Sequence, residues 1–151
     1  MSSKLSATVA LCMPIFDRIE SLAVHSQHHL VHSSTGADGQ KLVRHLVDVV
    51  GRPVDKARNM ITSSALARPE VTHLLWVDAD MVFDADSLER LLDHDLPIVG
   101  GLCYNRNHPY QPIIARNFDP SWAFASDTIG WVYDHPASGV IDVDATGGAF
   151  L

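Results

Sequence analysis

The stretch His73-Leu74-Leu75-Trp76-Val77-Asp78-Ala79-Asp80-Met81 decides the fold that this sequence predicts. Residues 74–77 are apolar at every position and too few for a typical helix, a pattern typical of a strand buried on both faces of a parallel sheet. Two carboxylates follow this strand directly. In open α/β sheets, ligands bind outside the carboxyl ends of the strands, so Asp78 and Asp80 are expected at a ligand-binding edge.

The two carboxylates predict a bound cation. Asp78 and Asp80 project to the same side if the strand persists, because side chains alternate along a strand. Two like charges a few ångströms apart repel each other and resist burial unless they share a cation or a proton. A hard divalent cation that keeps some of its water and takes substrate phosphates as its other ligands satisfies this pair.

Composition limits the function classes. The 151 residues suffice for one compact domain, and 46% of them are hydrophobic, as in an ordinary globular protein. With 18 acidic and 11 basic residues and a formal charge of -7, no broad electrostatic grip on nucleic acid or anionic membrane is expected. No apolar run reaches the length of a membrane span and residues 1–8 lack a signal-peptide pattern, which predicts a cytoplasmic protein. Cys12 and Cys103 are interpreted as reduced core residues.

The first third of the chain predicts a strand, a helix and a second strand. Residues 8–13 form an apolar run that Pro14 ends, and they are expected to be the first strand of the sheet. Asp17 either contacts a nucleotide base or ribose or caps a helix starting near residue 18, and the cap is favoured. The helix predicted over residues 19–31 is followed by a strand over residues 41–50, whose mixed character places it near the sheet edge.

A histidine cluster lies on that first helix. Its four members follow the spacing i, i+3, i+4 and i+7, which puts them on one helix face: His25, His28, His29 and His32. A transition-metal site is one interpretation. A solvated polar face is the other, and it is favoured because no cysteine or carboxylate accompanies the cluster.

The second helix is predicted to run from Pro53 to about residue 68. Arg58 lies in the middle of its apolar stripe, which consists of Val54, Ala57, Ile61 and Ala65. A buried guanidinium needs an anionic partner, and the Asp78/Asp80 pair or a bound diphosphate are the candidates. An arginine that extends to the surface is the alternative.

The remaining elements are shorter. A helix capped by Asp84 or Asp86 is predicted to bury leucines 88, 91 and 92, followed by a strand over residues 97–103 and a polar loop over residues 104–110 at the ligand edge. Strands are also expected at residues 113–116 and 140–145. Four aromatic residues between them form either a platform for a sugar face or the small core of a hairpin, and the core is favoured: Trp122, Phe124, Trp131 and Tyr133. The chain stops on an apolar run, which predicts that the natural protein continues.

Together these segments resemble a glycosyltransferase of the GT-A fold, close to family 2 and its phage and bacterial relatives. The matching segments are the first strand ending Met13-Pro14, Ala57-Arg58-Asn59, Leu74-Leu75-Trp76-Val77-Asp78-Ala79-Asp80 (a DXD motif), Ile98-Val99-Gly100-Gly101 with Tyr104 and Arg106, and Val143-Asp144-Ala145-Thr146-Gly147-Gly148-Ala149-Phe150-Leu151. The resemblance implies one GT-A-like (Rossmann-like) domain over residues 1–151, incomplete at its carboxyl end, with a mainly parallel central sheet and helices on both faces.

The resemblance also implies the roles of the site residues. The donor is a nucleotide-diphosphate sugar, the cofactor is Mn²⁺ or Mg²⁺, and the acceptor is a glycan, lipid or protein. Asp80 would hold the metal, while Asp78 would contact the ribose or the water shell of the metal. The other implied residues are Pro14, Asp17 and Arg58 for the donor, Tyr104, Arg106, Gly147 and Gly148 for the acceptor or sugar, and Asp144 as a substitute for the general base. The usual base of the family lies beyond the Gly-Gly segment, so slow or absent sugar transfer is expected.

Two other functions fit part of the pattern. A hydrophobic strand followed by Asp-Ala-Asp also occurs in haloacid-dehalogenase-type phosphatases, in which the first Asp is the nucleophile. That nucleophile usually lies close to the amino terminus, whereas Asp78 follows three earlier elements and no suitable Ser/Thr or Lys motif comes after it. The other alternative is a non-catalytic module that binds a sugar or nucleotide.

Overall fold

The computed structural model describes residues 7–105, 109–116, 130–148 and 150–151. The chain divides into two compact units, residues 1–99 with 148–151 and residues 100–147. Each unit contains its own three-stranded sheet. The two units differ in which residues contact one another and need not be separate domains. The prediction of one domain over residues 1–151 therefore stays a prediction.

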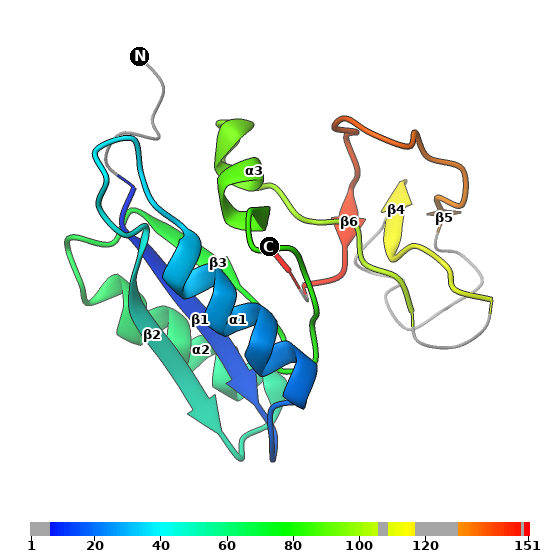
Figure 1. Cartoon of the computed structure of the whole chain (residues 1–151). Helices are drawn as coiled ribbons and strands as arrows, with labels where there is room; N and C mark the ends of the chain where they lie inside the picture. Colours follow the sequence, from blue (N-terminus) through cyan, green and yellow to red (C-terminus); the bar gives the residue numbers. More distant parts are fainter. Residues whose placement is uncertain (1–6, 106–108, 117–129, 149) are drawn as a thin grey trace. The chain divides into compact units, whose positions relative to one another are not determined.

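The first unit is built on a parallel sheet with the strand order β2-β1-β3 (Figure 1). Strand β1 spans Val9–Ile15, β2 spans Val43–Val50 and β3 spans His73–Trp76. Both ladders are parallel. The predicted mixed α/β class is confirmed at this level, as a small parallel sheet with helices.

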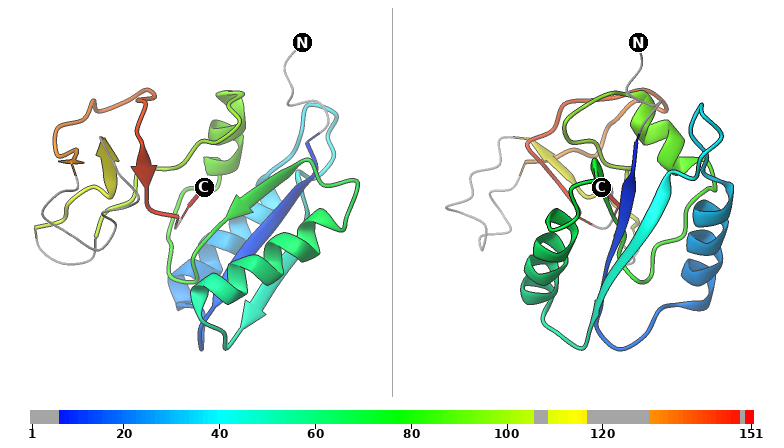
Figure 2. Two further views of the ribbon diagram at one scale, coloured as in Figure 1. Left: turned by 180° about the vertical axis from the view of Figure 1, so that it is seen from behind. Right: turned by 90° about the vertical axis from the view of Figure 1, so that its left-hand side faces the viewer.

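Two helices cover opposite faces of this sheet (Figure 2). They are α1, Ser21–Ser33, and α2, Val54–Leu66, and the unit also contains the short helix α3, Ser87–Asp93. The core on the α2 side consists of Ala10, Cys12, Val47, Ile61 and Ala65. Because side chains alternate along a strand, the buried Val9 and Leu11 face the α1 side.

Strand β3 is adjacent to β1, as predicted, but the prediction that both are central strands is wrong for β3. Within the described residues, β3 is the last strand of the parallel ladder. Its outer edge instead pairs with the end of the chain, where Trp76 N–H donates to Leu151 O at 2.7 Å and Leu151 N–H donates to Trp76 O at 3.0 Å. An antiparallel bridge joins Val77 and Phe150. These backbone bonds satisfy groups that an unpaired edge would expose.

Two predicted boundaries near the amino terminus are wrong. Pro14 does not end β1, since the strand continues to Ile15 and Pro14 pairs with Val49 of β2. Pro14 is tolerated because its missing N–H faces the side on which the β3 ladder has already ended. Asp17 does not cap α1, because the N-cap residue is Glu20.

Ile98 and Val54 are less buried than their patterns predicted, and two of the predicted strands are missing or shorter. No strand forms over residues 97–103, where Ile98 is 75% exposed. Val54, at the start of the α2 stripe, is 58% exposed, while Ala57, Ile61 and Ala65 are buried as expected. Of the strand predicted over residues 140–145, only Ala145 is in a strand, since β6 spans Ala145–Thr146.

The second unit contains an antiparallel sheet with the order β5-β4-β6. Its strands are β4 (Ile114–Arg116), β5 (Gly130–Trp131) and β6 (Ala145–Thr146). Gly130 is required in β5 because a Cβ there would collide with the carbonyl oxygen of Arg116. Trp131 and Tyr133 are 38% and 58% exposed and so are not a closed hairpin core, while the predicted Trp122 and Phe124 lie outside the described residues.

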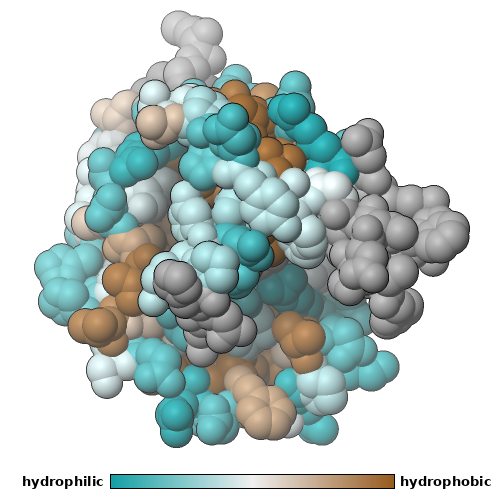
Figure 3. All heavy atoms as spheres, turned by 90° about the vertical axis from the view of Figure 1, so that its right-hand side faces the viewer, coloured by the Kyte–Doolittle hydropathy of each residue, from teal (hydrophilic) through white to brown (hydrophobic). Residues whose placement is uncertain are grey.

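The surface is mixed in character. On the face in Figure 3, hydrophobic residues (brown) form several separate small groups among hydrophilic ones (teal). Among the described residues, no helix combines the length and apolar character needed to cross a membrane.

Burial of Cys12 predicts a loss of stability at alkaline pH. Burial raises the pKa of the Cys12 thiol from 9.0 to about 11, while the nearby charge of Arg68 lowers it. Between pH 9 and 11, the Cys12 thiol has lost its proton in the unfolded chain but keeps it in the folded chain. The free energy of unfolding should therefore fall by up to about 1.4 kcal/mol per pH unit between pH 9 and 11. Urea unfolding of wild type and Cys12→Ala across this range tests the prediction, and equal slopes would contradict it.

Candidate functional site

The acidic turn, residues 78–81, lies just beyond the carboxyl end of β3 and is anchored by backbone bonds. Val77 N–H donates to Cys12 O of β1 at 3.0 Å, which continues the ladder to the edge of the turn. The Glu20 N–H, at the start of α1, donates to Ala79 O at 3.0 Å. Met81 N–H closes the turn onto Asp78 O at 3.2 Å. The carboxylates are therefore held on a turn tied to both the sheet and α1.

Arg58 links this turn to the end of the chain. Its Nη2 donates to Asp78 Oδ1 at 3.1 Å and to the carbonyl oxygen of Gly148 at 2.8 Å. Its Cζ lies 5.7 Å from the ring centre of Trp76, within the range of a cation–π contact. The predicted contact between Arg58 and the acidic pair is therefore present, at Asp78.

The Arg58–Asp78 pair is half-buried, with both side chains 35% exposed. The Nε of Arg58 is buried and has no hydrogen-bond partner among the described residues. A guanidinium carries five N–H donors, and a buried donor without an acceptor costs free energy. Holding the guanidinium at the acidic turn therefore leaves this one buried donor unsatisfied.

Gly148 leaves room for the guanidinium of Arg58. A Cβ on Gly148 would collide with the guanidinium, so only glycine fits without moving Arg58. The resemblance assigned Gly148 to the sugar or acceptor, whereas its observed contact is with Arg58 through its carbonyl oxygen. The glycine thus permits a close approach of backbone to side chain.

The carboxylates of the acidic turn can hold a hard divalent cation only if a bound substrate supplies further ligands to the ion. No group of three or more histidine, cysteine or acidic side chains converges within the described ranges. Mg²⁺-type ions are commonly held by one or two carboxylates together with substrate phosphates and water. The resemblance assigns Asp80 as the direct ligand, and two carboxylates on one turn fit a metal that arrives with a diphosphate.

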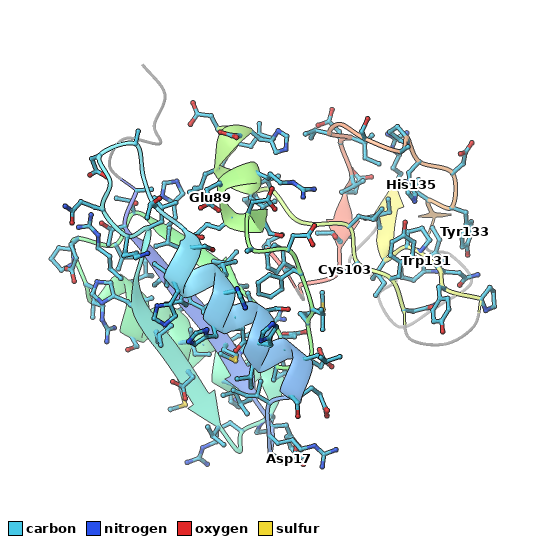
Figure 4. The ribbon with its side chains drawn as sticks, viewed as in Figure 1. Asp17, Glu89, Cys103, Trp131, Tyr133 and His135 are labelled. Atoms are coloured by element: carbon cyan, nitrogen blue, oxygen red, sulfur yellow. The ribbon has the colours of Figure 1, made fainter. Side chains whose placement is uncertain are left out.

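The other predicted site residues are distributed between the two units. Pro14 lies within β1, and Asp17 lies just past its carboxyl end, exposed (Figure 4). Tyr104, Gly147 and Asp144 belong to the second unit, and Arg106 lies outside the described residues.

Two contacts in these regions were not predicted. Trp76 was assigned only to the strand, and its position over the Arg58 guanidinium follows from the packing of α2 on the sheet and not from a sequence pattern. In the second unit, the Tyr104 hydroxyl lies 3.0 Å from Nε2 of His135, which is drawn with Trp131 and Tyr133 near β4 and β5 in Figure 4. Because 31 residues separate Tyr104 from His135, no local pattern reveals this pair.

A cavity of about 380 Å³ in the first unit does not involve the carboxylates. It is lined mainly by apolar side chains of β3, α3 and the following segment, including Leu74, Trp76, Leu88, Leu92 and Ile98. Such a lining suits apolar side chains and offers few partners for a diphosphate. The acidic turn therefore defines the candidate site in preference to this apolar cavity.

Comparison with protein-family models, curated proteins and solved structures found no match to this chain.

Proposed function

We propose that the chain binds a nucleotide-diphosphate sugar at the acidic turn, as a metal-dependent glycosyltransferase with a GT-A-like fold. One observation carries the proposal: a guanidinium paired with the first carboxylate of the DXD motif, at the carboxyl end of a strand in a parallel sheet. This edge is where open α/β sheets bind ligands. A cytoplasmic site of action fits the proposal.

Each group at the turn has a part in donor binding. Asp80 would hold Mn²⁺ or Mg²⁺, which when bound supplies Lewis-acid stabilisation of the diphosphate leaving group. Arg58 orients Asp78 through the Nη2 bond to its Oδ1, and the guanidinium can also donate to a phosphate oxygen. Asp78 is then directed at the ribose or at water around the ion. The turn is preorganised by its backbone bonds, so little reorganisation is needed on binding.

The test is calorimetric titration of the chain with uridine diphosphate and guanosine diphosphate in Mn²⁺, in Mg²⁺ and in chelator. Binding should be detected only with a divalent metal, because a diphosphate cannot approach two carboxylates on a chain of formal charge -7 without an intervening cation. Equal affinity for the nucleoside diphosphates in chelator and in Mn²⁺ would contradict the proposal of a metal-dependent glycosyltransferase.

The same samples distinguish the two rival functions. Metal-dependent nucleotide binding without donor hydrolysis would favour a non-catalytic module. A phosphorylated Asp78, trapped after incubation with a phosphate ester, would instead favour a phosphatase.

A further inference from the structure

The exposed face of α1 carries an unusual concentration of imidazoles. Four of the nine histidines of the chain lie within eight residues of this helix: His25, His28, His29 and His32. All four are exposed, while the buried residues of α1 are Ala23, Ser26, Gln27 and Leu30. The proposed nucleotide site uses none of these histidines.

The imidazoles are arranged as two pairs with i, i+4 spacing. The ring centres of His25 and His29 are 4.4 Å apart, and those of His28 and His32 are 4.3 Å apart. The rings of His28 and His29, which belong to different pairs, are 6.1 Å apart. The helix therefore holds the rings of each pair together and keeps the two pairs apart.

These separations are close to those of a chelate. With Zn–N bonds of about 2.1 Å and tetrahedral geometry, two imidazoles bound to one ion have ring centres about 5 Å apart, so a small rotation of the side chains would suffice. Two histidines at i and i+4 also hold zinc on the helix of metalloproteases. Here the glutamate that follows the first histidine in that motif is absent, since Ser26 follows His25 and His29 follows His28. The arrangement suits ion binding without hydrolysis.

We propose that α1 is a binding face for divalent transition-metal ions of the zinc class, with His25/His29 and His28/His32 as two separate chelating pairs. Imidazole nitrogen favours Zn²⁺, Ni²⁺ and Cu²⁺, whereas Mg²⁺ and Mn²⁺ favour oxygen. Because no three such side chains converge within the described parts of the chain, each ion takes two protein ligands and completes its shell with water. The pairs are therefore chemically distinct from the acidic turn.

The experiment titrates the chain with ZnCl₂ by calorimetry and compares three double variants that each keep two of the four histidines. His28→Gln/His32→Gln keeps the first pair, and His25→Gln/His29→Gln keeps the second. His28→Gln/His29→Gln keeps His25 and His32, which are too far apart in sequence to chelate. The first two variants should each bind one ion, and the third should bind at least about tenfold more weakly because it loses the effective concentration of the second ligand.

Two controls make the outcome decisive. His94→Gln, an exposed histidine next to α3, should leave zinc binding unchanged. Asp80→Asn should also leave it unchanged, and loss of zinc binding in that variant would assign the ion to the acidic turn and overturn the proposal. Equal zinc affinity in the three double variants would likewise overturn it. Because all four histidines are exposed, folding of the variants, checked by circular dichroism, should be preserved.

Discussion

Asp80→Asn should abolish the metal dependence of nucleoside diphosphate binding and weaken that binding at least about tenfold. Asn keeps the shape of the side chain but removes the negative charge that attracts the cation. The attraction between a carboxylate and a cation in direct contact exceeds about 1.4 kcal/mol, the free energy of a tenfold change in affinity. Calorimetry with uridine diphosphate in Mn²⁺ and in chelator measures both effects in one series.

The matched control for Asp80→Asn is Asp84→Asn. It makes the same change in charge four residues further along, at an exposed side chain whose Oδ2 lies 3.5 Å from Nη1 of Arg90. An exposed pair of this kind contributes little, so Asp84→Asn should bind like wild type. If both variants lose the same affinity, the effect reflects net charge and Asp80 is not a metal ligand.

Arg58→Met should weaken diphosphate binding by about tenfold or more while lowering the free energy of unfolding by only about 1 kcal/mol. The large effect on binding is expected because the guanidinium orients Asp78 and donates toward the phosphates. The small effect on folding is expected because the ion pair is 35% exposed on both sides, so water can replace part of it. Calorimetry and urea unfolding on the same preparation separate the two effects.

Two further variants serve as comparisons for the nucleotide affinity of Arg58→Met. Lys56→Met removes a positive charge from the exposed surface of the same helix and should leave binding unchanged. Gly148→Ala keeps the guanidinium but forces it to move, so it should weaken binding in the same direction as Arg58→Met. If Arg58→Met leaves nucleotide affinity unchanged, the arginine has a structural role only.

The sequence alone determined the adjacency of the two most apolar strands and indicated the acidic pair as a candidate partner of Arg58. Residues 9–13 and 74–77 are uninterrupted apolar runs, and such runs are stable only where both faces are covered, which placed them side by side in a parallel sheet. Arg58 lies on the buried stripe of α2, and a guanidinium there needs an acceptor. The pattern offered the Asp78/Asp80 pair or a bound diphosphate as that acceptor, and the structure shows the contact with Asp78.

Other features depended on pairings that no local pattern encodes. The apolar run over residues 97–103 predicted a strand, but a strand also needs a neighbouring backbone, and apolar character reports burial without specifying that partner. The outer edge of β3 is instead paired with Phe150 and Leu151, which made β3 the last parallel strand.

The same limit applies to the candidate site. The sequence identified the two carboxylates because only Ala79 separates them along the chain. Only the tertiary structure decided that Arg58 bonds to the carbonyl oxygen of Gly148, 90 residues away, and stacks near Trp76. The physical reason is that a local pattern fixes which face of an element is buried, whereas the partner across that face is chosen by the packing of the whole unit.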